Sequence, residues 1–170
     1  GYRVALHGLD GHTPGRLYAG ETLARLGLPP ARDFAEAQAQ LAERGFAYLS
    51  LDRFSPQLAR LMGLKPVLGL RSAVNTLARS LNPFQARASL QAAFHPGYVP
   101  IHRDAALALG DARVWSFRGD GGENERRPEK PVEVAAAENG LARDFTLPPL
   151  IEGAAEKETP EIGRASCRER

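Results

Sequence analysis

The chain has 170 residues, of which 43% are hydrophobic and 25% are charged, and its formal net charge is +2. This length and apolar content are typical of one globular domain with a sizeable core. No apolar run is long enough to span a bilayer and no leader segment is recognisable, so we expect a soluble, cytoplasmic protein with no membrane partner.

The last nine residues change how this composition is interpreted. Residues 162–170 read IGRASCRER, and all nine match the translation of a common short-read sequencing adapter. We therefore expect a non-native tail there, with a natural basic tail as the alternative. The tail holds Cys167, which is the only cysteine, and a net charge of +2. The rest of the chain is then neutral and free of cysteine, which excludes disulfides, zinc-thiolate sites and a catalytic thiol.

Hydrophobic periodicity and the placement of Gly and Pro predict strands that alternate with helices. In chain order the expected strands are 2–8, 46–51, 89–94, 114–118 and 132–136, and the expected helices are 18–26, 34–44, 56–62, 71–81 and 99–109. Asp33 and Ser55 are the expected N-caps, and Glu36 completes a capping box with Asp33. Such alternation is typical of an α/β fold with a mostly parallel sheet and helices on both faces. Residues 150–161 are rich in Pro and Glu, and we expect them to be poorly ordered.

Charge is distributed unevenly along the chain. No Asp or Glu occurs between Arg53 and Arg103, whereas acidic residues dominate from Asp120 to residue 161. A long stretch with only positive charge indicates an anionic ligand, either a phosphorylated small molecule or a nucleic-acid backbone. The alternative is that these arginines are solvated and pair with the acidic half of the chain.

Three motifs carry a resemblance to a known family. They read LGLRSAVNTLARSLNP at residues 68–83, FHPGYV at 94–99 and GDGGENERRP at 119–128. Together they resemble anthranilate phosphoribosyltransferases, and most closely a paralogous branch often labelled glycosyltransferase family three, some members of which bind nucleic acid. The resemblance covers residues 1–149. It implies a partial phosphoribosyltransferase-like α/β domain that lacks its N-terminal helical domain, so we expect the chain to be a fragment of a longer protein.

The resemblance places several residues on the acceptor side of such a domain. His7 keeps half of a lysine-histidine-glycine-asparagine motif, and Ser55 stands where the family has a histidine before proline. Lys65 replaces an arginine that contacts anthranilate, and lysine lacks the planar fork that binds a carboxylate with two hydrogen bonds. Arg79 falls in a glycine-proline position that faces the aromatic substrate. The expected substrate-binding residues are His7, Lys65, Arg71 and Arg79.

The GDGG motif implies two further roles. In the family this loop holds magnesium on the pyrophosphate, so Asp120 and Glu125 are the expected metal ligands, with Asn124 in place of an aspartate. Magnesium prefers carboxylates and water, and the change to Asn124 should weaken its binding. The basic tip of the same loop could instead contact nucleic acid, and a plain surface turn is the third alternative. The expected nucleic-acid-binding residues are Arg79, Arg126, Arg127 and Lys130.

Two functions stay open at this point. The lost family positions favour a catalytically impaired paralogue that binds single-stranded nucleic acid. The alternative is an active glycosyl- or phosphoribosyltransferase that uses phosphoribosyl pyrophosphate and magnesium on an aromatic acceptor. The glycine-rich donor loop of the family does not occur in these 170 residues, so we expect the fragment alone to be inactive and assign no catalytic residue. The parent is expected to form a homodimer through the helical domain.

Overall fold

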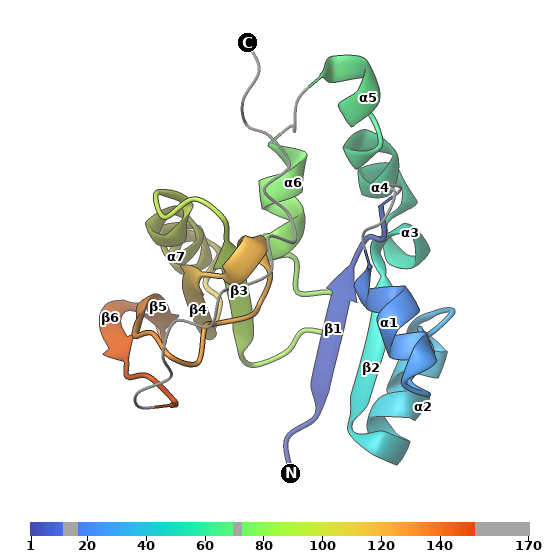
Figure 1. Cartoon of the computed structure of the whole chain (residues 1–170), viewed down its shortest axis with the longest axis horizontal. Coiled ribbons are helices and arrows are strands. Elements are labelled where there is room, and N and C mark those ends of the chain that lie inside the picture. Colours follow the sequence, from blue (N-terminus) through green and yellow to red (C-terminus); the bar gives the residue numbers. More distant parts are fainter. Residues whose placement is uncertain (12–16, 70–72, 152–170) are drawn as a thin grey trace. The chain divides into compact units, whose positions relative to one another are not determined.

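A computed structural model describes residues 1–11, 17–69 and 73–151 of the chain (Figure 1). The chain divides into two compact units, Gly1–Ala86 and Arg87–Arg170, and the second is described as far as residue 151. Arg71, residues 152–161 and the tail 162–170 lie outside the described residues, so the predictions made for them stay predictions. Within the described parts, no helix is long and apolar enough to cross a membrane.

Unit 1 is built on a two-stranded parallel sheet. Its strands are β1 (Val4–Gly8) and β2 (Phe46–Ser50), in a register that runs from Val4 opposite Phe46 to Gly8 opposite Ser50. The helices are α1 (Ala19–Arg25), α2 (Phe34–Arg44), α3 (Leu51–Phe54), α4 (Pro56–Met62), α5 (Lys65–Leu68) and α6 (Val74–Leu77), followed by the 3-10 turn η1 (Ala78–Ser80). The core of this unit consists of Ala31, Ala37, Ala47 and Leu49, with Leu41, Phe54 and Phe84 packed against it.

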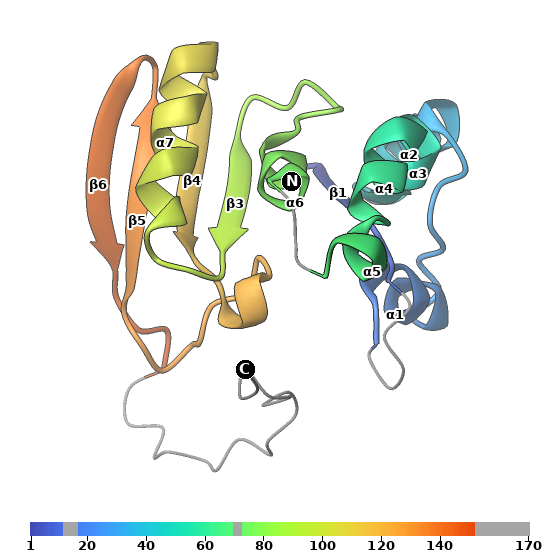
Figure 2. The ribbon, with the colours of Figure 1, turned by 90° about the horizontal axis from the view of Figure 1, so that it is seen from above.

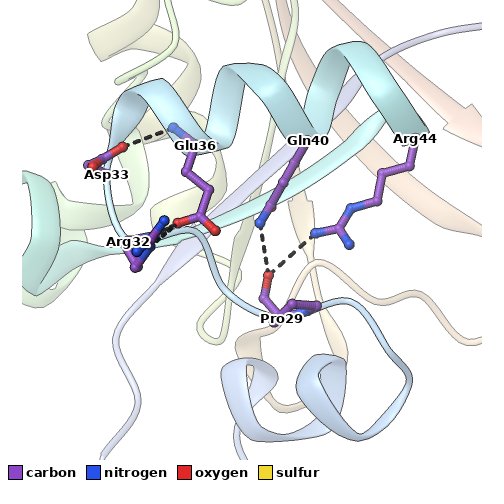
Figure 3. A network of polar contacts seen from close by, with 6 residues as sticks. All are labelled: Pro29, Arg32, Asp33, Glu36, Gln40 and Arg44. Atoms are coloured by element: carbon purple, nitrogen blue, oxygen red, sulfur yellow. Dashed lines mark hydrogen bonds and ion pairs between the residues drawn. The ribbon is translucent and has the colours of Figure 1, made fainter.

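The predicted N-cap of α2 is confirmed (Figure 3). A carboxylate oxygen of Asp33 accepts a 2.9 Å hydrogen bond from the backbone N–H of Glu36. The Glu36 carboxylate reaches back one residue further than in a standard capping box, because it accepts from both the backbone N–H and the Nε of Arg32, each at 2.8 Å. The N–H of Glu36 in the first turn and the N–H of Arg32 just before the helix are thus satisfied by side chains that were already visible in the sequence.

The other end of α2 is fixed to the loop that precedes it. The side chains of Gln40 and Arg44 both donate to the carbonyl of Pro29, at 3.3 and 3.4 Å (Figure 3). Gln40 is only 8% exposed, so this hydrogen bond satisfies a polar group inside the unit. Gly45 ends the helix in the left-handed conformation, with φ of 74°.

Two local predictions in unit 1 are wrong in detail. Ser55 precedes α4, but its side chain makes no capping hydrogen bond. Pro56 occupies the first helical position, where its fixed φ starts the helix without a side-chain cap. The helix expected over 71–81 is described only from Val74, and after Leu77 it tightens into η1. Leu81 is extended, as expected close before a proline.

Unit 2 contains a four-stranded sheet with strand order β3-β4-β5-β6 (Figure 2). The elements are β3 (Ser89–Ala93), α7 (Tyr98–Leu109), β4 (Arg113–Arg118), the 3-10 turn η2 (Asp120–Gly122), β5 (Val132–Glu138) and β6 (Leu141–Leu147). Strands β3 and β4 are parallel, whereas β4, β5 and β6 are successively antiparallel. Asn139 and Gly140, both with positive φ, make the two-residue turn between β5 and β6.

The α/β class is confirmed, and the expected sheet needs correction. Among the strand pairs described, only β1–β2 and β3–β4 are parallel. The two-residue turn after β5 can only return antiparallel, and the longer segment 119–131 also leads from β4 to an antiparallel β5. Helix α7 covers one face of the unit 2 sheet (Figure 2). Val99 packs on β3 and β5, and Ala106 packs on β4 and β5. The opposite face is a layer of side chains rather than a helix. Its members are Ala92, Phe117, Val134 and Ala136, with Trp115, Val132, Phe145 and Leu147 around them.

An ion-pair network joins α7 to the edge strand β6. Arg103 is paired with Asp104 through its Nε at 2.8 Å and with Asp144 through its Nη1 at 2.6 Å. The Arg103 side chain is only 18% exposed, whereas both carboxylates face solvent. Arg103 belongs to the basic stretch of the sequence, and it is neutralised within its own unit.

Candidate functional site

A pocket of about 350 Å³ opens in unit 1, within the size range of small-molecule sites. Three segments that are distant in sequence form it: the start of α2, the α3–α4 junction and the turn after η1. The lining residues are Phe34, Phe54, Ser55, Leu58, Leu81, Asn82 and Pro83. The leucine-asparagine-proline motif and the serine in the family's histidine position therefore line the same pocket.

His7 contacts two of the residues that line this pocket, Leu81 and Phe54. Its Nε2 lies 3.0 Å from the Leu81 carbonyl, and its ring meets the Phe54 ring edge-on at 5.7 Å. A carbonyl only accepts, so Nε2 carries the proton and donates it. Burial lowers the pKa of His7 below its usual 6.5, and the hydrogen bond to Leu81 opposes this only in part. His7 is therefore a neutral donor that holds the pocket's turn, and it is not itself among the lining residues.

Two phenylalanines, Phe34 and Phe54, line the pocket, and Phe84 packs against Phe34. Phe34 lies 6.1 Å from Phe54 and 5.7 Å from Phe84, measured between ring centroids. Both pairs are inclined rather than stacked, as aromatic pairs prefer. The wall thus consists of ring edges and faces that a flat aromatic ligand can contact.

The polar groups of the pocket are few and neutral. The Asn82 side chain is used within the turn, because it donates to the Ala86 carbonyl and accepts from the Ala86 N–H, both at 2.8 Å. The Ser55 hydroxyl is the other side-chain polar group on the lining. Among the described residues that line the pocket, none is charged. The expected contacts from Lys65 and Arg79 are not found here.

A second hollow of about 440 Å³ lies at the carboxyl ends of β1 and β2. The buried Tyr48 hydroxyl donates to Asp10 at 3.4 Å, and the Gly20 N–H donates to the same carboxylate at 3.3 Å. Burial, and then the Asp10 charge, raise the pKa of Tyr48, so it remains a donor. The arginines on this lining pair with neighbouring carboxylates, Arg53 with Asp52 among them, so its charge is already balanced.

In unit 2 the GDGG motif forms a tight loop after β4. Asp120 donates its N–H to the Glu125 carbonyl at 2.8 Å, and Glu123 donates back to the Asp120 carbonyl at 3.0 Å. Gly121 and Gly122 have φ values of 60° and 81°, a conformation that other residues rarely adopt. The expected metal ligands Asp120 and Glu125 are thus joined through the backbone of one closed loop.

The side chains of this loop do not suit a divalent cation. Both Asp120 oxygens face the guanidinium of Arg127, at 3.4 Å from Nε and 3.5 Å from Nη2. The Asn124 amide nitrogen donates to the Leu90 carbonyl at 3.2 Å. Across the described residues there is no group of three or more His, Cys, Asp or Glu side chains that could hold a metal ion. We therefore derive no step through magnesium.

The residues expected to bind nucleic acid are not gathered on one surface of a single unit. Arg79 lies in η1 of unit 1, whereas Arg126, Arg127 and Lys130 belong to unit 2. Arg126 is half-buried and donates to the Pro148 carbonyl at 2.7 Å. Arg127 is paired with Asp120, so two of the four arginine and lysine side chains already serve the fold.

The aromatic wall was not predicted. The sequence assigned neither Phe34 nor Phe54 to a site, because their approach depends on tertiary packing. One signal was available, since Phe54 directly precedes the Ser55-Pro56 pair that the resemblance places at the acceptor.

No protein-family model matches the chain. The chain is 32% identical over 140 residues to anthranilate phosphoribosyltransferase from Novosphingobium aromaticivorans, which covers 82% of the chain and 42% of that protein. The enzyme from Nitratidesulfovibrio vulgaris is 29% identical over 167 residues, covering 98% of the chain and 48% of that protein. A variant of the Saccharomyces cerevisiae enzyme, solved in complex with 4-fluoroanthranilate, superposes with a TM-score of 0.66 at 18% identity, over 88% of the chain and 39% of that structure. The chain thus spans less than half the length of these relatives.

Proposed function

From the homology of this chain to anthranilate phosphoribosyltransferases over most of its length, we propose that unit 1 is the acceptor-binding part of a phosphoribosyltransferase-like protein and binds a neutral planar aromatic ring. The observation that carries this proposal is the convergence of Phe54-Ser55, Leu81–Pro83 and the neutral His7 at one pocket. These segments are far apart in sequence, and the resemblance expects His7 and Ser55 on the acceptor side.

The chemistry of the lining selects the kind of ring. The walls are aromatic and aliphatic, and the Ser55 hydroxyl can both donate and accept one hydrogen bond. An anionic ring such as anthranilate would lose hydration on entry without gaining a cationic partner from the described lining residues. An uncharged aromatic amine or a nucleobase suits the lining better, because one polar edge can meet Ser55 while the ring faces contact Phe34 and Phe54.

The loop of unit 2 at residues 119–131 supports the proposal that the protein binds an aromatic ring but transfers phosphoribosyl groups to it inefficiently. Phosphoribosyl transfer builds negative charge on the leaving pyrophosphate, and that charge requires a cation at the right place. In this loop Asp120 is already paired with Arg127, and Asn124 replaces a family aspartate. We therefore propose that the whole protein is catalytically impaired, and the association of two copies through a helical domain stays a prediction.

Binding by the intact chain tests the pocket. Isothermal titration with aniline, adenine, uracil and anthranilate should rank the neutral rings above the anion. Phe54→Ala removes the ring that touches His7 and Phe34, and each such aromatic contact is worth about 0.5–1.5 kcal/mol. We expect about two- to tenfold weaker binding. Phe94→Ala is the matched control, because Phe94 is a 54% exposed phenylalanine of unit 2. Equal affinity in wild type and Phe54→Ala, or tighter binding of anthranilate, would contradict the proposal.

Nucleic acid is the second candidate, and one observation favours it. A neutral pocket with aromatic walls also suits an unstacked base of a single strand. The engagement of Arg126 and Arg127 within unit 2 weighs against a strong backbone contact. Oligonucleotide binding measured against salt decides this, because phosphate contacts give a steep slope and ring binding alone gives a flat one. The proposal that the whole protein is catalytically impaired has its own test, because magnesium-dependent turnover of phosphoribosyl pyrophosphate by the full-length parent would contradict it.

A further inference from the structure

The loop between β4 and β5 is shaped by its own backbone. A Cβ built on Gly119 would lie 1.8 Å from the Glu123 carbonyl oxygen and 2.7 Å from the Ala92 Cβ, so only glycine fits there. One on Gly122 would lie 3.0 Å from the Phe94 Cβ. The crossed backbone hydrogen bonds between Asp120 and its neighbours close the turn. This loop therefore has a defined form that no bound ion is needed to explain.

The charge of the Asp120 carboxylate is balanced by another side chain of the same loop. The Arg127 guanidinium faces the Asp120 carboxylate with two nitrogens, Nε and Nη2, which is the fork-like geometry that arginine offers to a carboxylate. Both side chains are about half exposed. A cation approaching Asp120 must therefore displace a guanidinium held on the same loop, seven residues away.

We propose that Arg127 takes the place of a divalent cation at Asp120, so that this carboxylate is neutralised and the loop keeps its conformation without bound metal. Magnesium requires near-octahedral oxygen ligands and usually binds through one or two carboxylates plus water and phosphate. Here one of the two expected carboxylates is paired with Arg127, and the neighbouring Asn124 directs its amide nitrogen to Leu90. This inference concerns unit 2 and does not depend on ring binding in unit 1.

Paramagnetic manganese, as a probe for magnesium, tests this inference in the intact chain. Manganese broadens the amide signals of residues close to it, so Gly121 and Gly122 report on binding at the loop. The wild-type chain should show no saturable broadening of these two signals. Arg127→Gln frees the Asp120 carboxylate, and manganese affinity at the loop should rise by up to about fivefold, the gain expected from releasing one exposed ion pair. Adding Asp120→Asn to that variant should abolish the gain.

The matched control is Arg143→Gln, which removes an exposed arginine paired with Glu138 at 3.8 Å elsewhere in unit 2. It should leave the loop signals as in wild type. Chemical shifts of the loop measured with and without a chelator give a second readout, and they should coincide. Saturable broadening of Gly121 and Gly122 in wild type, equal to that in Arg127→Gln, would overturn the proposal. A change in the wild-type loop on chelation would overturn it as well.

Discussion

Replacement of His7 tests how the pocket of unit 1 is held together. His7 donates from Nε2 to the Leu81 carbonyl and meets the Phe54 ring edge-on. His7→Phe keeps an aromatic ring but removes the donor, whereas His7→Gln keeps an N–H donor but removes the ring. The pair of variants therefore separates the hydrogen bond from the aromatic contact.

The expected cost follows from the partners of His7. Loss of a donor costs the net hydrogen bond and leaves a carbonyl without its partner, together about 1–3 kcal/mol. Leu81 is only half-buried, so water can reach its carbonyl and the lower part of that range applies. For a unit of this size, each kcal/mol lowers the melting temperature by about 4–8 °C. His7→Gln should cost less than His7→Phe if the hydrogen bond dominates.

The pH dependence gives a second, independent signature. Burial lowers the pKa of His7 in the folded state, so below about pH 6.5 the unfolded chain binds a proton that the folded chain resists. Stability should thus fall as pH drops below the ordinary value and should be constant above it. This part of the slope should disappear in both variants. Amide exchange of β1 and β2 at several pH values measures it, and an unchanged slope and stability in His7→Phe would refute the reasoning.

Three further predictions concern the fold. Asp33→Ala should lower the free energy of unfolding by about 1 kcal/mol, because the cap on Glu36 is lost, while an asparagine at the same position should be nearly neutral in denaturant titration. Gly119→Ala should lower the free energy of unfolding of unit 2 by about 1–3 kcal/mol and should shift the amide signals of the loop. Gly97→Ala should be as stable as wild type, because a Cβ added at Gly97 has no atom within 4 Å. Arg103→Gln should lower the free energy of unfolding of unit 2 by less than about 1 kcal/mol, because both partner carboxylates are exposed. Thermal unfolding should show a smaller difference from wild type at high salt, which screens this ion pair.

Local features of the fold were predictable and tertiary ones were not. The Asp33 cap and the Gly45 terminus each depend only on neighbours within about four residues, so both could be predicted from the sequence. The hairpin between β5 and β6 was missed although Asn139-Gly140 is a strong turn signal. Charged residues within Leu141–Leu147 obscured the alternation that would have revealed the second strand.

The candidate site shows the same division. The resemblance placed His7 and Ser55 on the acceptor side, and both lie at or against one pocket, which the turn at Pro83 also lines. The aromatic wall could not be predicted, because the approach of Phe34 to Phe54 is set by how α2 packs in unit 1. The same holds for Arg127, whose pairing with Asp120 depends on the path of the loop.

The β5–β6 hairpin has a consequence for the order in which unit 2 folds. Its paired residues begin at Glu138 opposite Leu141, so its first contacts close a very short loop. Such hairpins form in about 1–10 μs, whereas the parallel pairing of Ser89 with Val114 must wait for the intervening α7 to pack. Synthesis on the ribosome releases β3 first, yet β3 has the slowest pairing to make. We expect unit 2 to fold from its last strands back toward β3, and pulse-labelled amide exchange should show β5 protected before β3.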